Sequence, residues 1–98
     1  MNKRGILLNK IKELKKTRVD NKDIIIGYST GDGDFYGSIW IDKNINPVKF
    51  AYLFNENKFV FLDEFAPVDN EWVESNVESK LYELLNLELE LDNLNNFY

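Results

Sequence analysis

Residues 24–42, IIIGYSTGDGDFYGSIWID, decide the fold, because they join two runs of β-branched and aromatic residues through a glycine-rich segment. Ile24 to Thr30 is the first predicted strand, and Asp34 to Asp42 is the second. Gly31-Asp32-Gly33 lies between them and supplies residues that tolerate a positive φ, so it is predicted to be a hairpin turn. The stretch therefore predicts two antiparallel strands at the start of a sheet.

Two further strands continue this sheet. Val48 to Phe54 and Phe59 to Phe65 are rich in aromatic and aliphatic residues, and a polar four-residue turn separates them. Every connection between the four runs is short, and short connections join antiparallel neighbours. The sequence therefore predicts a four-stranded antiparallel meander.

A helix is predicted before the sheet, over residues 4–17. Leu7, Ile11 and Leu14 recur at helical spacing, and lysines occupy the opposite face. Residues 19–23 are polar and are interpreted as a connection. We thus expect an amphipathic helix with a basic outer surface.

A second helix is predicted after the sheet, with Asp69 or Asn70 as its cap. Residues 86–92 alternate leucine with acidic residues, a pattern typical of a strand, whereas Leu and Glu are good helix formers. The favoured interpretation is a helix with a bend near Asn86. The alternative is an extra C-terminal strand.

The element order α-β-β-β-β-α predicts one α+β domain over residues 1–98. Alternation along the second strand places Phe35, Ile39 and Ile41 on one face and Tyr36 and Trp40 on the other. If both helices cover the same face, Tyr36 and Trp40 form an exposed patch, a possible second partner surface. If one helix covers each face, they form a second core layer.

The chain has no His and no Cys, which excludes Ser-His and Cys-His catalysis, disulfides and most zinc sites. Asp32-Gly33-Asp34 resembles the start of a calcium loop, but Lys43 stands where such a loop needs a glutamate. We therefore expect no enzyme activity, no cofactor and no bound metal. No apolar run could span a bilayer, and the N-terminus is no signal peptide, so a cytoplasmic location without membrane contact is expected.

Charge is distributed unevenly along the chain, whose net charge is −5. Residues 1–20 carry seven cations and two anions, whereas residues 63–98 carry ten anions and one cation. The two ends could pack together and neutralise each other. Alternatively, each could present its field to a different partner.

The acidic final third is the feature that points to a function. A carboxylate-lined surface can occupy a basic groove that normally holds nucleic acid. Aromatic side chains among the acids would anchor such a contact. The predicted partner-binding residues are Asp63, Glu64, Asp69, Glu71, Trp72, Glu74, Glu78 and Tyr82.

The chain resembles small anti-CRISPR proteins in its general properties, because it is short, acidic, free of cysteine and predicted to be α+β. No sequence motif carries this resemblance. Abundant Asn, Lys and Ile with few Ala and Arg are typical of AT-rich genomes, including those of phages and plasmids. The leading hypothesis is a phage- or plasmid-encoded, non-catalytic inhibitor that binds a basic, nucleic-acid-handling host defence enzyme, in the manner of anti-CRISPR or anti-restriction proteins, and blocks its groove.

Two alternatives accompany this hypothesis. The first is an immunity or antitoxin protein that neutralises a cognate toxin. The second is a small nucleic-acid-binding regulator that uses the lysines of residues 10–16. Direct nucleic-acid binding is not favoured, because the second helix is acidic and would repel phosphate. A homodimer through the aromatic face or the leucine-rich tail is a further expectation to be tested.

Overall fold

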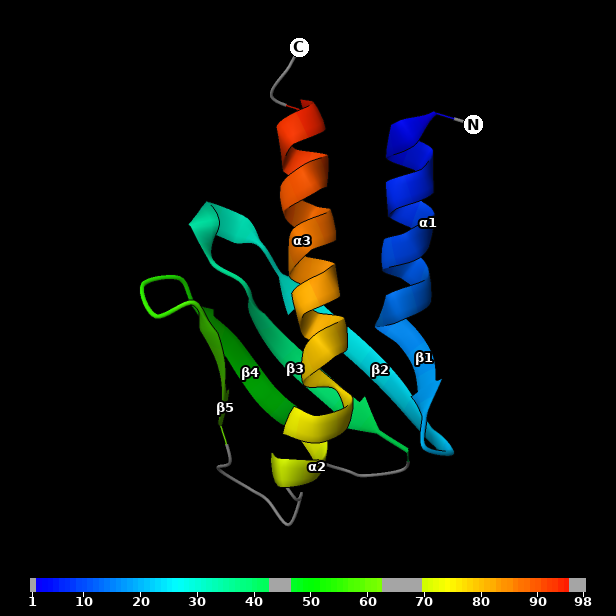
Figure 1. Cartoon of the computed structure of the whole chain (residues 1–98), viewed down its shortest axis with the longest axis vertical. Coiled ribbons are helices and arrows are strands. Elements are labelled where there is room, and N and C mark those ends of the chain that lie inside the picture. Colours follow the sequence, from blue (N-terminus) through cyan, green and yellow to red (C-terminus); the bar gives the residue numbers. More distant parts are fainter. Residues whose placement is uncertain (1, 43–46, 63–69, 96–98) are drawn as a thin grey trace.

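The computed structural model describes residues 2–42, 47–62 and 70–95. A five-stranded antiparallel sheet forms one layer, and helices on one of its faces form the other (Figure 1). The strands follow each other in chain order across the sheet, so the predicted α+β class and antiparallel meander are confirmed. The elements are α1 (Lys3–Lys15), β1 (Lys16–Val19), β2 (Lys22–Ser29), η1 (Gly31–Gly33), β3 (Tyr36–Ile41), β4 (Val48–Leu53), β5 (Lys58–Leu62), α2 (Asn70–Asn76) and α3 (Glu78–Asn95).

The fifth strand is β1, which the sequence analysis assigned to the end of the first helix and to a polar connection. That assignment is wrong, because residues 16–19 pair with β2, with Lys16 opposite Ile25. Asp20 and Asn21 both have positive φ values, 51° and 63°, as in a two-residue hairpin turn. Aspartate and asparagine tolerate this conformation, so the chain reverses directly after the helix and a short strand forms.

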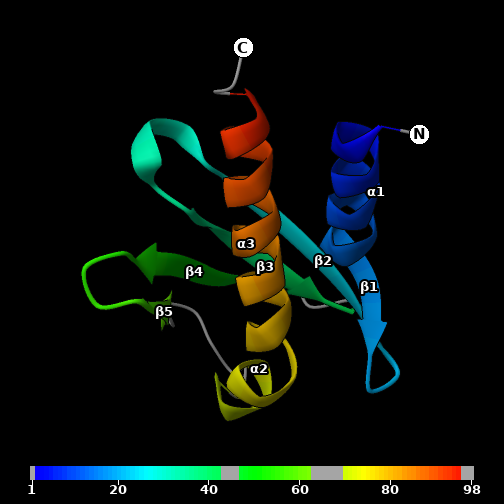
Figure 2. The ribbon, with the colours of Figure 1, turned by 45° about the horizontal axis from the view of Figure 1, so that its top comes forward.

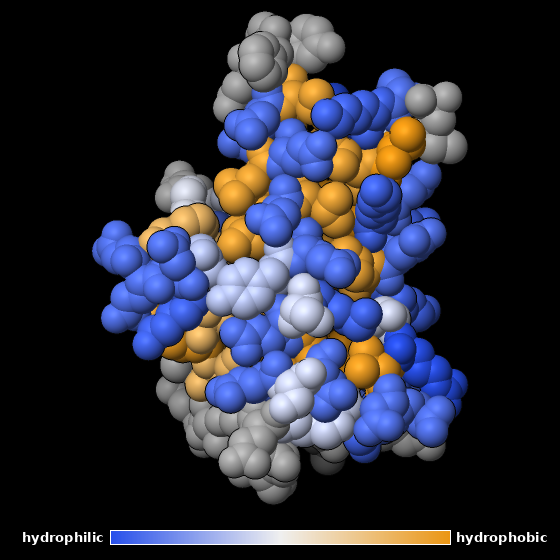
Figure 3. All heavy atoms as spheres, in the orientation of Figure 1, coloured by the Kyte–Doolittle hydropathy of each residue, from blue (hydrophilic) through white to orange (hydrophobic). Residues whose placement is uncertain are grey.

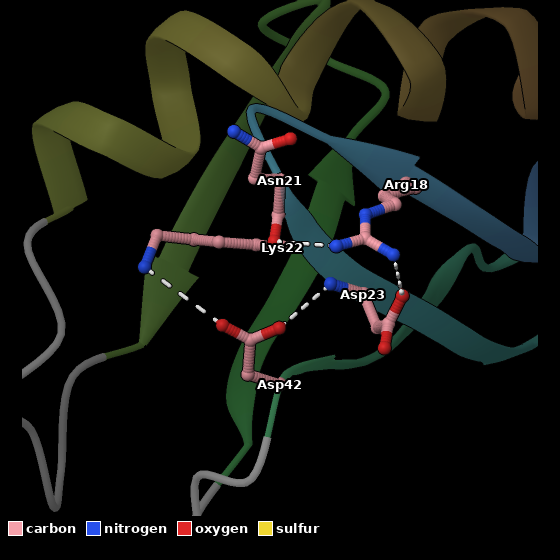
Figure 4. A network of polar contacts seen from close by, with 5 residues as sticks. All are labelled: Arg18, Asn21, Lys22, Asp23 and Asp42. Carbon is pink, nitrogen blue, oxygen red and sulfur yellow. Dashed lines mark hydrogen bonds and ion pairs between the residues drawn. The ribbon is translucent and has the colours of Figure 1, made fainter.

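Polar contacts fix this hairpin to the end of β3 (Figure 4). Arg18 donates a 3.4 Å hydrogen bond to the Asn21 carbonyl, and its guanidinium lies 3.9 Å from the Asp23 carboxylate. The Asp42 carboxylate accepts a 2.7 Å hydrogen bond from the Asp23 amide and lies 3.9 Å from the Lys22 ammonium. Asp42, which directly follows β3, therefore binds the start of β2 next to the β1–β2 turn.

The connection between β2 and β3 is longer than the predicted hairpin turn. Residues 31–33 form one turn of 3₁₀ helix, and the Asp34 amide donates to the Gly31 carbonyl at 3.1 Å. Gly33 has a φ of 79°, which glycine adopts without strain. Gly33 therefore supplies a positive φ as predicted, but the connection between β2 and β3 is longer than a hairpin turn of residues 31–33.

The C-terminal region is helical throughout its described part. Residues 86–92 lie within α3, so the favoured interpretation of a helix is confirmed there and the alternative of a C-terminal strand is wrong. An interruption lies at Val77, between α2 and α3, beside Asn76, whose side-chain amide donates to the Trp72 carbonyl at 2.9 Å. Glu88 fits within the apolar stripe because it accepts a hydrogen bond from the Tyr28 hydroxyl at 2.6 Å.

One core lies between the sheet and the helices. Phe35, Phe50 and Phe59 from the sheet form an aromatic cluster with ring centroids 5.9–6.0 Å apart. Ile11 of α1 and Leu81 of α3 join this core from above. Figures 1 and 2 both show α1 and α3 side by side over the same face. All described helices therefore cover one face, and the opposite face of the sheet has no helix upon it among these residues.

None of the helices in the described part of the chain has the length and apolar character needed to span a bilayer.

Candidate partner-binding surfaces

The structure places only part of the predicted acidic surface. Asp63, Glu64 and Asp69 lie outside the described residues. Glu71 belongs to α2, and its side chain lies outside the described part of the structure. The remaining predicted residues lie on two successive helices, Trp72 and Glu74 on α2 and Glu78 and Tyr82 on α3.

Glu74 and Glu78 form a pair of like charges. Glu74 is exposed, and neither carboxylate makes an ion pair with another described residue. Burial raises the pKa of Glu78, and the negative charge of Glu74 raises it further. The pair therefore opposes its own ionisation, and a cation brought by a partner would relieve this repulsion.

Trp72 and Tyr82, the two predicted anchors, are already engaged with the fold. Trp72 packs against the core, and the Lys22 ammonium lies 5.9 Å from its ring centroid. Tyr82 contacts Phe59 edge-on at 4.8 Å, and its hydroxyl donates to the Asn57 carbonyl at 3.5 Å. Burial raises the pKa of Tyr82, as does the nearby charge of Glu78. Both rings are half-buried, so only part of each is open to a partner.

The basic first helix neutralises little of the acidic surface within the described residues. Lys3 and Glu90 form the one ion pair between α1 and α3 there, at 3.3 Å. Glu74, Glu83 and Asp92 are exposed and make no ion pair in this part of the chain. Among the described residues, mutual neutralisation of the two ends therefore accounts for a single contact, and Glu74, Glu83 and Asp92 keep their negative charge uncompensated by an ion pair there.

A groove on the sheet side of α3 is a site that the sequence analysis missed. It lies between the C-terminal half of α3, the η1 connection and the β4–β5 turn, with a volume of about 480 Å³. Figure 3 shows apolar side chains on both flanks of this half of α3. We call it the acidic groove. Its lining includes apolar Phe54, Leu85 and Leu89 and acidic Asp34, Glu88 and Asp92.

The acidic groove combines apolar surface with a single sign of charge. Phe54 and Leu89 are 44% and 47% exposed, and both line the groove. No lysine or arginine stands among the described residues that line the groove. It could therefore receive an apolar side chain flanked by cations. Phe54, at the end of a strand, and Leu89, outside the buried stripe, were the signals in the sequence.

The face of the sheet turned away from the helices carries Tyr36 and Trp40. They are 50% and 41% exposed, and Ile25, opposite Trp40 on β2, is 49% exposed. The interpretation in which both helices cover one face is thus confirmed, and the second core layer is not formed by described residues. We call this surface the outer sheet face.

The described residues include no cluster of three or more acidic side chains placed to hold a metal ion. Comparison of the chain with protein-family models, with curated proteins and with solved structures gives no match.

Proposed function

We propose that this chain is a phage- or plasmid-encoded inhibitor that acts by binding, without catalysis. Its target would be a basic, nucleic-acid-handling enzyme of a host defence system, a CRISPR or restriction nuclease. The carboxylates around the acidic groove, together with Glu74 and Glu78, would face the cationic cleft that the nuclease uses for its substrate, and the groove itself would receive an apolar side chain of the nuclease. The observation that carries the proposal is that exposed apolar side chains lie in one groove with Asp34 and Asp92, whose carboxylates form no ion pair with another described residue.

Charge alone would not make this surface a binding site, because exposed carboxylates are common and exposed ion pairs contribute little. Apolar contacts supply the affinity that exposed charges alone do not provide. Phe54 and Leu89 expose large apolar surfaces beside the carboxylates of Asp34 and Asp92. A buried apolar contact provides affinity, and surrounding charge provides steering and specificity. The groove offers both to a lysine- or arginine-rich partner.

The repulsion between Glu74 and Glu78 supports the same proposal. Glu74 lies near the end of α2 and Glu78 begins α3, and the negative charge of Glu74 raises the pKa of Glu78. A cationic partner would convert this repulsion into attraction on binding. The two residues therefore extend the negative field of the groove along the helix layer.

The proposal is tested by measuring cleavage of a DNA or RNA substrate by purified CRISPR and restriction nucleases with and without the chain. A double variant, Asp34→Lys with Asp92→Lys, should lose inhibition because its groove would repel a cationic cleft. Glu13→Lys on α1 makes one charge reversal of the same kind on an exposed residue outside the groove and should inhibit like the wild type.

Two results would contradict the proposal. One is full potency of the Asp34/Asp92 double variant, which would remove the groove from the mechanism. The other is activity confined to a toxin nuclease, which would identify the chain as an immunity protein acting through a basic partner of another class.

A further inference from the structure

The outer sheet face has a chemistry opposite to that of the acidic groove. Tyr36 and Trp40 lie four residues apart on β3, so both point to this face, about 13 Å apart along the strand. Small residues lie between them, because Ser38 pairs with Gly27 on β2. Two exposed aromatic rings thus stand at the ends of a low, open stretch of sheet.

Cations flank this aromatic row on both sides. Lys16 on β1 lies opposite Ile25, which in turn lies opposite Trp40. Lys49 on β4 lies opposite Ser38, midway between the two rings. Both lysines are exposed and make no ion pair with another described residue. The row therefore has a positive charge near each of its long sides.

The remaining charges on this face do not reverse its sign. Arg18 and Lys58 also point outward, and each lies 3.9 Å from an acid, Asp23 and Glu56 respectively. Asp23 is the one anion that the described strands place on this face. The outer sheet face is thus net positive on a chain whose net charge is −5.

The positive charge of the outer sheet face indicates which kind of partner it would bind. Two copies of the chain that met through this face would each bring a net positive charge to the contact, and like charges repel. An anionic occupant is favoured instead. Among anions, single-stranded nucleic acid combines a phosphate backbone with planar bases that stack on exposed aromatic rings.

We propose that the outer sheet face binds single-stranded nucleic acid, with bases stacked on Tyr36 and Trp40 and phosphates held by Lys16 and Lys49. This site is separate from the acidic groove and goes beyond inhibition of a nuclease. It also differs from the basic first helix, because the lysines at positions 10 and 12 belong to α1 and not to this face.

The test is fluorescence anisotropy of a labelled single-stranded oligothymidylate of about twelve nucleotides at about 50 mM salt. The wild type should bind, with affinity that falls as salt rises. Tyr36→Ala with Trp40→Ala should weaken binding by about fivefold or more, because stacked bases are lost. In a Trp72→Phe background, bound oligonucleotide should quench the emission of Trp40.

A second variant, Lys16→Glu with Lys49→Glu, tests the proposal even if the aromatic variant folds poorly. We expect it to abolish binding, because it replaces the cations that hold the phosphates. Lys10→Glu with Lys12→Glu is the matched control on α1 and should bind like the wild type. The proposal is overturned by absence of binding, by loss of binding only in the α1 control, or by equal affinity for duplex DNA or for a polyglutamate peptide. A wild-type dimer in light scattering that the Tyr36/Trp40 variant lacks would also overturn it, by assigning the face to a second copy.

Discussion

The hydroxyl of Tyr28 on β2 donates a 2.6 Å hydrogen bond to the carboxylate of Glu88 on α3. The ammonium of Lys15, at the end of α1, lies 4.8 Å from the centroid of the same ring. One half-buried tyrosine therefore contacts both long helices and the sheet beneath them. Burial raises its pKa, and the bond to Glu88 raises it further. The contact fixes α3 in the position that forms one wall of the acidic groove.

Replacement of Tyr28 by phenylalanine should therefore destabilise the fold. The variant keeps the ring but leaves the half-buried Glu88 carboxylate without its donor. Hydrogen bonds to charged groups contribute about 1.5–3 kcal/mol, and partial exposure of the pair lowers this to about 1–2 kcal/mol. Urea unfolding followed by circular dichroism measures the change. An unchanged free energy of unfolding would show that the hydrogen bond contributes nothing to stability.

Gly37 on β3 should not tolerate a side chain, whereas Gly27 on β2 should. A Cβ at Gly37 would lie 1.9 Å from the Gly27 carbonyl oxygen and 2.7 Å from the Cα of Tyr28, both backbone atoms that cannot rotate away. A Cβ at Gly27 would meet nothing within 4 Å. Gly37→Ala should cost at least about 2 kcal/mol, as steric strain in a packed region does, and Gly27→Ala less than about 0.5 kcal/mol. Thermal unfolding of the two variants side by side decides this, and equal stability would contradict the close approach.

Glu78→Gln should make the protein slightly more stable at pH 7. The pKa of Glu78 is raised in the folded state by burial and by Glu74, so the folded protein holds this proton more tightly than the unfolded chain. The stability that this proton confers on the wild type is complete below the ordinary glutamate pKa of about 4.3 and is lost as pH rises through the raised value. The advantage of the variant should be about 0.5 kcal/mol or less at pH 7.

The pH profile of unfolding provides the control for this prediction. The difference between Glu78→Gln and the wild type should shrink as pH falls toward about 4. A difference that grew with acidity would mean that Glu78 is stabilised, not repelled, in its ionised form.

Leu89 and Phe54 should matter for partner binding and little for folding. Both are largely exposed, and exposed apolar residues contribute little to the core. Leu89→Ser with Phe54→Ser should change the free energy of unfolding by less than about 1 kcal/mol and weaken nuclease inhibition at least about tenfold. Leu81→Ala, at a fully buried position of the same helix, is the contrasting variant and should cost about 2–5 kcal/mol in stability. Full inhibition by the Leu89/Phe54 variant would remove the apolar contact from the mechanism.

Most of the fold could be predicted from local pattern. β2 to β5 follow the runs of β-branched and aromatic residues, and the faces of β3 follow strict alternation. β1 could not be found this way, because its four residues are mostly polar and lie directly against a helix. Its signal was Asp20-Asn21, a pair that allows a hairpin turn but favours it less than Asn-Gly does.

The candidate site was harder to predict because it depends on distant pairing. Asp34, Phe54 and Asp92 meet only when η1, the β4–β5 turn and α3 are placed together. Glu88 looked misplaced in an apolar stripe because its partner, Tyr28, lies sixty residues away in the sequence. Composition indicated an acidic C-terminal third, but only packing shows which carboxylates lie beside apolar surface.

Displacement of labelled duplex DNA from a target nuclease by the chain tests the central claim most directly. A duplex is used because it does not engage the stacking surface proposed for Tyr36 and Trp40. The wild type and the Tyr36/Trp40 variant should displace the duplex equally, since displacement depends on the acidic groove. The Asp34→Lys, Asp92→Lys variant should leave the duplex bound. Two results would contradict the claim that the acidic surface of this chain fills the nucleic-acid cleft of the nuclease. One is displacement of the duplex by that variant at wild-type concentrations, and the other is inhibition while the duplex stays bound.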